Sequence, residues 1–287
     1  MPKPLVTVII PTRNRAAQLK RTLDSLLQDD YPNKEVIVCD GASTDETIEV
    51  LQSYGGSIKW ISAKDGGEYP ARNKGLSMGT GELFRFMSDD IVAYPGAFSF
   101  AIQYLDAHPD VDVLFGQTET YYAAYGDKPV LLPAIHFGQA SVSLRNLIRQ
   151  TLPLPPSETA FFRRSVIDCI GLFNIQLPGA DNEYWVRAAK SGLKLRVADL
   201  LFTQGVMQYV WSTRKSLHLL RQQTRLARQY GDWSDVVYTW SSRFIPGVAR
   251  LIARDVLHAF GIYPSRAKVR RIMQSSKTAI ESQQTRD

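Results

Sequence analysis

Three short apolar runs alternate with two helical patterns at the start of the chain, and this alternation restricts the fold more than any other feature. The strand-like runs are residues 5–10, 36–39 and 58–61. Between them, leucines recur at helical spacing after Asn14, and Ser43 with Glu46 matches a capping box that begins a second helix. Strands that alternate with helices form right-handed β-α-β units. We therefore expect an α/β fold with a Rossmann-like, mixed and mostly parallel sheet flanked by helices.

A further apolar run, residues 82–87, ends at Ser88 and two adjacent carboxylates, Asp89 and Asp90. The last residues of a parallel strand lie at the carboxyl edge of the sheet, where ligands bind. Neighbouring carboxylates repel each other unless a positive charge lies between or beyond them, and a hard divalent cation is the usual solution. The pattern predicts a metal ion that also holds phosphates. A polar turn followed by a helix N-terminus is the alternative.

Composition indicates a folded protein without a membrane span. Of 287 residues, 44% are hydrophobic and 22% are charged, which suits a chain with a buried core. No run of 18 or more apolar residues occurs. The N-terminal residues lack the apolar segment of a signal peptide, so we expect a cytoplasmic protein. Cys39 and Cys169 are far apart and outside any CxxC pair, which indicates neither a disulfide framework nor a zinc site.

The positive charge is concentrated at the C-terminal end of the chain. Residues 201–287 hold 14 Lys and Arg against 5 Asp and Glu, a net charge of +9, whereas residues 1–200 have a net charge of −3. We expect a core domain over residues 1–200 and a basic helical extension over residues 201–287. Within the extension, residues 244–260 predict an amphipathic helix with an arginine face. Such a helix packs on the core domain or contacts an anionic membrane.

Five sequence blocks, in this order, resemble family 2 glycosyltransferases of the GT-A fold. The blocks are residues 8–15 (VIIPTRNR), 40–45 (DGASTD), 71–75 (ARNKG), 81–90 (GELFRFMSDD) and 171–187, which contains GLFN and DNEYWVR. The resemblance covers residues 5 to about 200. It implies an inverting enzyme that moves a sugar from a nucleotide-sugar to a hydroxyl of a glycan or lipid-linked acceptor. A UDP-sugar is the favoured donor, although GDP- and dTDP-sugars use the same scaffold.

The resemblance assigns a set of residues to the nucleotide. They are Pro11, Thr12, Arg13, Asp40, Arg72 and Asp89. Asp40 closes a strand beside Thr12, where its carboxylate can accept the imide N–H of uracil. A guanidinium such as that of Arg72 suits a diphosphate or a base carbonyl. The alternative for Asp40 is a turn-forming role before Gly41.

Ser88-Asp89-Asp90 matches the DXD-type motif of the family, with serine in the first position. By resemblance, Asp90 coordinates Mn²⁺ or Mg²⁺, and Asp89 reaches the ribose or the metal shell. The missing first carboxylate does not abolish metal binding, because phosphate oxygens and water fill the remaining positions.

The late acidic block supplies the expected catalytic base, Asp181, which follows a loop and opens a helix. In the implied mechanism, Asp181 takes the proton of the acceptor hydroxyl, which attacks from the face opposite the nucleotide and inverts the anomeric carbon. A helix N-cap is its alternative role. Glu183 and Arg187 are four residues apart and predict a supporting ion pair. Trp185 lines the acceptor side or packs in the core.

Two other functions compete with this interpretation. A sugar-phosphate nucleotidyltransferase also has a Rossmann-like sheet, but the residues after the first strand, 11–15, are not its glycine-rich loop. A non-catalytic module that binds a nucleotide or nucleic acid is the third possibility. We expect no nucleic-acid partner, because clustered acids on the ligand edge oppose a phosphate backbone. We expect instead that residues 240–275 of the basic extension bring the enzyme to the anionic inner face of the cell membrane.

Overall fold

The computed structural model describes residues 3–122, 130–131, 140–149, 156–177, 180–207 and 213–239. The chain divides into two compact units, residues 1–119 with 135–204, and residues 120–134 with 205–287. The predicted boundary at residue 200 stays a prediction, and the amphipathic segment 244–260 lies outside the described residues.

The first half of the chain contains the three strands and two helices that the alternating pattern predicts, together with further strands and helices. In order they are β1 (Val6–Thr12), α1 (Ala16–Gln28), β2 (Lys34–Asp40), α2 (Thr47–Ser53), the 3-10 turn Gly55–Ser57, β3 (Lys59–Ser62), α3 (Glu68–Met78), β4 (Leu83–Phe86), β5 (Ile91–Ala93) and α4 (Ala97–Ala107). The first unit continues with β8 (Ala140–Val142), α5 (Leu144–Arg149), the 3-10 turn Ser157–Thr159, β9 (Ala160–Arg163), α6 (Arg164–Ile170) and α7 (Ala180–Lys190).

Two long strands, β6 (Val113–Tyr122) and β10 (Leu195–Met207), begin in the first unit and end in the second. The second unit also contains β7 (Val130–Leu131), α8 (Thr213–Tyr230) and α9 (Trp233–Thr239). We expected the strand pattern to stop at Leu200, and β10 shows that this was wrong: strand geometry continues to Met207. None of the described helices is long and apolar enough to cross a membrane.

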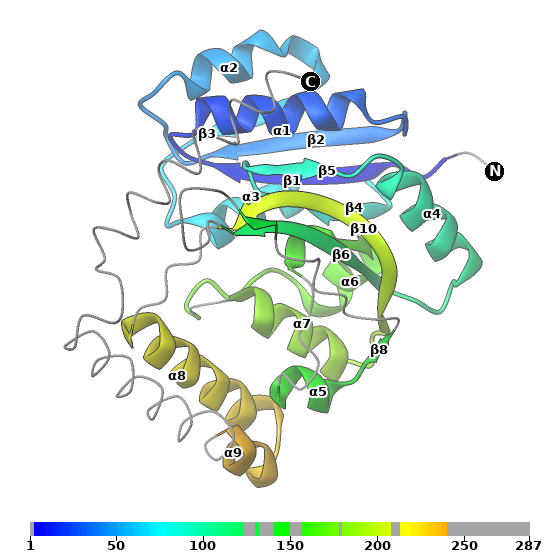
Figure 1. Ribbon diagram of the computed structural model, residues 1–287, viewed down its shortest axis with the longest axis vertical. Coiled ribbons are helices and arrows are strands. Elements are labelled where there is room, and N and C mark those ends of the chain that lie inside the picture. The colour runs from blue at the N-terminus through cyan, green and yellow to red at the C-terminus, as the bar shows by residue number, and fades with distance from the viewer. Residues whose placement is uncertain are drawn as a thin grey trace. The chain divides into compact units, whose positions relative to one another are not determined.

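The strands form one mixed sheet in the order β3-β2-β1-β4-β9-β6-β10-β5 (Figure 1). Strands β3, β2, β1 and β4 are parallel neighbours, and β9 pairs antiparallel with both β4 and β6. This arrangement confirms the predicted mixed α/β fold. The register places Thr12 directly beside Asp40, and Met87 at the end of β4 donates its backbone N–H to Ile9. The carboxyl ends of β1, β2 and β4 therefore meet at one edge.

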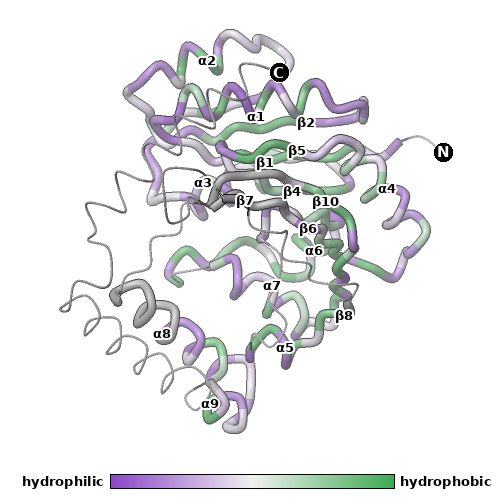
Figure 2. The backbone as a smooth tube through the Cα atoms, viewed as in Figure 1, coloured by the Kyte–Doolittle hydropathy of each residue, from purple (hydrophilic) through white to green (hydrophobic). Residues whose placement is uncertain are grey.

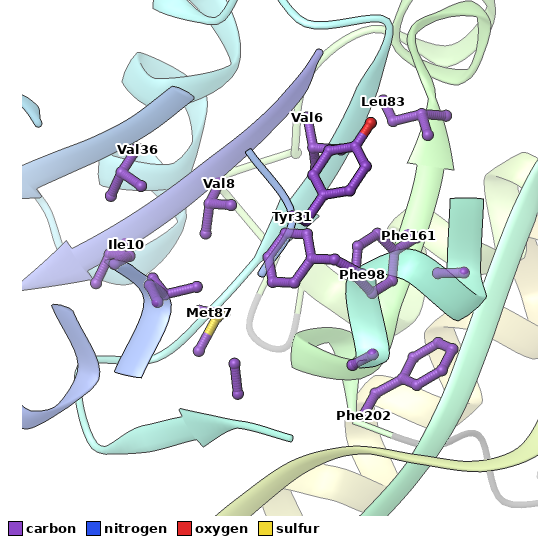
Figure 3. Close-up of a cluster of buried hydrophobic side chains, with 14 of the residues drawn as sticks. Val6, Val8, Ile10, Tyr31, Val36, Leu83, Met87, Phe98, Phe161 and Phe202 are labelled. Atoms are coloured by element: carbon purple, nitrogen blue, oxygen red, sulfur yellow. The ribbon is translucent and has the colours of Figure 1, made fainter. Parts of the chain in front are cut away.

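Side chains of β1 alternate between two cores. Val6, Val8 and Ile10 point to the face covered by α1 and α4, where Tyr31, Phe98, Phe161 and Phe202 complete the cluster (Figure 3). The tube in Figure 2 shows the apolar strands β1 and β2 beside helices of mixed hydropathy, as expected for strands buried on both faces. Cys39 is buried in the smaller cluster under α3.

Helix α3 lies directly on β1, and a glycine makes this possible. A Cβ atom built at Gly75 would lie 2.3 Å from Cγ2 of Ile9, far inside van der Waals contact. The glycine of the block Ala71–Gly75 therefore has a packing role: it lets the backbone of α3 approach the sheet.

Residues of the preceding loops set the starts of helices α3 and α2. Helix α3 begins at Glu68, directly after Gly67 at φ +123°. The expected capping box of Ser43 and Glu46 does not form. Instead, Oδ1 of Asp45 accepts the N–H of Thr47, and the Ser43 hydroxyl bonds to Asp40 at the end of β2.

Candidate active site

The carboxyl ends of β1 and β4 are joined by a side-chain hydrogen bond. The Thr12 hydroxyl donates to Oδ2 of Asp89 over 2.8 Å, and the Thr12 carbonyl accepts the N–H of Gly41 over 2.9 Å. The Arg13 side chain lies beside Gly41: a Cβ atom built at Gly41 would be 3.3 Å from Cδ of Arg13. Three segments that are distant in the sequence thus come together at the edge where the parallel sheet predicts a ligand.

The Asp40 carboxylate is buried and already accepts hydrogen bonds on both oxygens. Its Oδ2 accepts the N–H of Ser43 over 3.0 Å and the hydroxyl of Ser62 over 2.6 Å, and its Oδ1 accepts the Ser43 hydroxyl. Asp40 is 1% exposed. These bonds give the turn-forming role a full structural account, whereas the contact with a nucleobase stays a prediction.

Asp89 and Asp90 differ in their surroundings. Burial raises the pKa of Asp89 to about 6, against the hydrogen bond from Thr12 and the charge of Arg15. The Asp90 side chain is 37% exposed, and its Oδ2 lies 2.8 Å from Nη1 of Arg15. Arg15 also lies 3.6 Å from Asp89. Arg15 stands in the first sequence block, yet we expected no role for it, because the β1–α1 loop brings it to the carboxylates only in the fold.

A divalent cation fits this edge only with ligands from outside the protein. Among the described residues, no group of three or more His, Cys, Asp and Glu could hold a metal ion. Asp90 is accessible, but Asp89 is buried and bonded to Thr12. Mg²⁺ and Mn²⁺ commonly take one or two carboxylates together with phosphate oxygens and water, and the residues present match that requirement.

Arg72 is fully buried and paired with two glutamates. Its Nη2 lies 2.7 Å from Oε1 of Glu158 and 2.5 Å from Oε1 of Glu68. Burial lowers the pKa of Arg72, whereas the charges of Glu158 and Glu68 raise it. The raising effects together are the larger, so the pKa of Arg72 lies above its usual value. Its guanidinium also lies 5.0 Å from the Phe86 ring centre. Its contact with the nucleotide stays a prediction.

Glu158 is the central residue that the sequence did not reveal. Besides the Arg72 guanidinium, its Oε1 accepts the hydroxyl of Ser88 over 3.0 Å, and Ser88 directly precedes Asp89. Burial raises the pKa of Glu158, but Arg72 and Ser88 lower it below its usual value. Glu158 follows a proline-rich stretch and carries no motif, and it is 86 positions from Arg72. Only the pairing of β9 with β4 brings the two together.

Asp181 lies in the first turn of α7 and accepts a hydrogen bond from Tyr69 in α3. The Tyr69 hydroxyl donates to Oδ1 of Asp181 over 3.0 Å. The Tyr69 ring is held against Phe173, with centres 5.6 Å apart. We gave Tyr69 no role from the sequence, because it precedes the recognisable block 71–75. Helix α3 carries both Tyr69 and Arg72, so it connects Asp181 to the Arg72 guanidinium. Arg72 pairs with Glu158, which accepts the hydroxyl of Ser88 beside Asp89.

The remaining residues of α7 support its position. Nε of Arg187 lies 2.9 Å from Oε1 of Glu183, which is the predicted ion pair. Trp185 is 1% exposed, donates its indole N–H to the Ser157 hydroxyl over 2.9 Å and packs edge-on against Phe115. Of the two roles expected for Trp185, its burial supports packing. Because Ser157 is the neighbour of Glu158, this bond also fixes the 3-10 turn that presents Glu158.

Known proteins resemble this chain in sequence and in fold. The family model described as Glycosyl transferase family 2 matches residues 7–171. An uncharacterized glycosyltransferase of Rickettsia felis is 29% identical over 214 residues, 71% of this chain and 33% of that protein. A PGL/p-HBAD biosynthesis glycosyltransferase of Mycobacterium bovis is 28% identical over 180 residues, 61% of this chain and 66% of that protein. The chain thus spans about a third of the length of the first curated relatives it matches.

Solved structures show the same fold. S. aureus TarS 1-349 in complex with UDP-GlcNAc has a TM-score of 0.61 and 22% identity, over 82% of this chain and 69% of that one. The mannosyltransferase PcManGT from Pyrobaculum calidifontis, in complex with GDP-Man and Mn²⁺, has a TM-score of 0.62 and 20% identity, over 97% of this chain and 81% of that one. At this identity the structures establish the GT-A fold alone. Since the family model matches more than half of the sequence, the chain belongs to glycosyl transferase family 2.

Proposed function

We propose that this protein is an inverting glycosyltransferase that moves a sugar from a nucleotide-sugar, favoured to be a UDP-sugar, to a hydroxyl of a glycan or lipid-linked acceptor. One observation carries the proposal. The candidate base and the carboxylate pair, 92 and 91 positions apart, belong to one network of side chains anchored on helix α3. In that helix, Tyr69 donates to Asp181, and Arg72 pairs with Glu158, which accepts the hydroxyl of Ser88 beside Asp89. Family membership and the nucleotide-sugars bound by TarS and PcManGT support it.

Each end of the network has a separate task in the reaction. Asp181 accepts the proton of the acceptor hydroxyl as that hydroxyl attacks the anomeric carbon. The Tyr69 hydroxyl donates to Oδ1 of Asp181, so we assign the other oxygen, Oδ2, to the acceptor hydroxyl. At the other end, Asp90 and Asp89 would hold Mn²⁺ or Mg²⁺, which offsets the charge of the departing diphosphate when bound. A single base facing the leaving group implies inversion.

A ligand panel and one variant test the proposal. Thermal unfolding is followed with UDP, GDP and dTDP, each with and without Mn²⁺, because a ligand that binds the folded state raises the unfolding temperature. We expect a metal-dependent rise with UDP. Replacement of Asp181 by Asn should keep this rise while product formation from the matching nucleotide-sugar falls roughly 10²–10⁴-fold. If no nucleotide shifts the unfolding temperature, or if Asp181→Asn keeps full activity, the proposal is wrong.

We further propose that the basic extension holds the enzyme at the anionic inner face of the cell membrane, close to a lipid-linked acceptor. Two features support this. Residues 201–287 have a net charge of +9, and each Lys or Arg near an anionic surface contributes about 1 kcal/mol. On α9, Trp233 and Val237 lie one turn apart and are 78% and 61% exposed, which gives that helix an apolar ridge.

Flotation on liposomes tests this second proposal. The full chain and a shortened chain ending at residue 239 are mixed with vesicles that contain or lack phosphatidylserine. We expect the full chain to float only with the anionic vesicles at low salt. Equal recovery of the shortened chain would show that residues 240–287 do not bind the membrane.

A further inference from the structure

The region between the candidate base and the carboxylate pair contains more acidic charge than its cations neutralise. Glu68, at the start of α3, has a side chain 49% exposed to solvent and shares Nη2 of Arg72 with Glu158. The next residue, Tyr69, contacts Asp181. Glu68 therefore borders the space that the proposed function assigns to the donor sugar.

Electrostatic interactions place Glu68 near both ends of this space. Partial burial raises the pKa of Glu68, the Arg72 charge opposes this, and the charges of Glu158, Asp181 and Asp90 raise it further. Geometry independently ties Glu68 to the end that holds Asp181, because Tyr69, the next residue in α3, donates its hydroxyl to Oδ1 of Asp181.

The cations in contact with these acids, within the described part of the chain, are already committed. Arg72 is 1% exposed, and its Nη2 contacts both Glu68 and Glu158. Arg15 pairs with Asp90 and Asp89 at the nucleotide end. A buried guanidinium that already serves two carboxylates cannot neutralise a third without losing one of them. An additional negative charge on the sugar would therefore lie among acids whose cations are already shared between two carboxylates each.

We propose that the donor sugar is electrically neutral, and that Glu68 is the residue that selects a neutral sugar over an acidic one. The inference rests on the proposed glycosyltransferase function and extends it to the class of donor. Carboxylates accept hydrogen bonds from sugar hydroxyls, so a neutral hexose gains contacts at Glu68. A uronic acid, which carries a carboxylate at C6, meets like charge instead, and unfavourable pairs of this kind reject wrong partners.

Competition binding with matched nucleotide-sugars tests the proposal. The two ligands differ only at C6: UDP-glucose and UDP-glucuronic acid, or GDP-mannose and GDP-mannuronic acid if GDP rather than UDP binds. Each displaces a fluorescent nucleoside diphosphate from the full chain in the presence of Mn²⁺. We expect the neutral sugar to bind at least about tenfold more tightly to the wild type, and this ratio to fall as salt screens the exposed charge.

Two variants, each of which removes one negative charge, distinguish a specific effect of Glu68 from a general effect of net charge. Glu68→Gln keeps the shape of the side chain and an oxygen for Arg72, and it should reduce the ratio at least about threefold through tighter binding of the acidic sugar. Glu82→Gln is the matched control: Glu82 is also exposed, but it lies beside the opposite end of β4, next to Leu83. It should leave the ratio unchanged.

The outcomes distinguish this inference from the proposed function. If the nucleoside diphosphate binds but both sugars bind equally, or if Glu68→Gln leaves the ratio unchanged, the selection by Glu68 is refuted and the glycosyltransferase proposal stands. If none of UDP, GDP and dTDP binds with Mn²⁺, the proposed function itself fails, and the inference fails with it.

Discussion

The pairing of Arg72 with Glu158 gives the most demanding prediction, because it ties stability to the site. Replacement of Glu158 by Ala leaves the buried guanidinium with Glu68 alone and removes the acceptor of the Ser88 hydroxyl. Breaking one partner of a buried ion pair costs about 3–5 kcal/mol. Because Glu68 remains as a partner but is 49% exposed, we expect a net loss of about 2–3 kcal/mol in the free energy of unfolding.

A double-mutant cycle measures the interaction energy between Arg72 and Glu158 apart from the contribution of each side chain alone. Arg72→Met removes the buried charge, so the double variant Arg72→Met/Glu158→Ala has no unpaired guanidinium. We expect it to lose at least about 1 kcal/mol less than the sum of the single variants, as measured by urea unfolding. Lys20→Ala is the control, since Lys20 is 60% exposed in a surface pair and should change stability by under about 0.5 kcal/mol.

The same variants report on the site. Since Glu158 holds Ser88 beside Asp89, Glu158→Ala should weaken the binding of UDP with Mn²⁺ by about tenfold, a cost of about 1.4 kcal/mol. Titration calorimetry measures this below the unfolding transition. Additive stability losses, or a Glu158→Ala protein with unchanged stability and nucleotide affinity, would refute the account of Glu158 as the link between α3 and β4.

Two further predictions concern the scaffold. Gly75→Ala places a Cβ 2.3 Å from Cγ2 of Ile9, so we expect overpacking to outweigh the gain in helix propensity and to lower the free energy of unfolding in urea by about 1–2 kcal/mol. Gly56→Ala is the control, because a Cβ at Gly56 meets nothing within 4 Å and should not lower stability. Equal stability of the two variants would contradict the packing role of Gly75. Burial raises the pKa of Glu35, but hydrogen bonds from the Lys59 ammonium, from the Thr80 backbone N–H and hydroxyl, and from the Thr7 hydroxyl lower it to about 2. The ionised carboxylate thus stabilises the fold above its ordinary pKa of 4.5 and loses this effect as pH falls towards 2. Glu35→Gln should therefore be less stable than the wild type by about 1–2 kcal/mol at pH 7, a value reduced for solvent screening, and the difference should shrink in acid; a constant difference in unfolding free energy would contradict this.

The apolar runs and motif blocks were sufficient to predict the parallel half of the fold. Runs that are buried on both faces have no amphipathic alternative, so β1 and β2 could be assigned from composition and their order alone. The carboxyl edge followed from the same logic, and Thr12 and Asp40 do lie side by side there. The family resemblance rested on these same local blocks, and the family match confirms it.

Local patterns were less reliable at element boundaries. The capping box at Ser43 satisfied the sequence rule, yet the hydroxyl bonds to Asp40 because the end of β2 offers a buried carboxylate three residues away. Similarly, β10 continues beyond Leu200 because its pairing within the sheet supports a segment whose own sequence signal is weak. In both cases a tertiary partner outweighed local propensity.

By itself, the sequence determined which residues form the strands, which strand ends carry acids, and which family the chain resembles, because these depend on short-range order. Only the tertiary structure decided that Glu158 joins Arg72 to Ser88, that Tyr69 holds Asp181, and that Arg15 reaches Asp90. Those contacts link positions that are 70 to 112 residues apart in the sequence. Such long-range pairs leave no periodicity or spacing in the sequence, since burial in a shared low-dielectric site selects them.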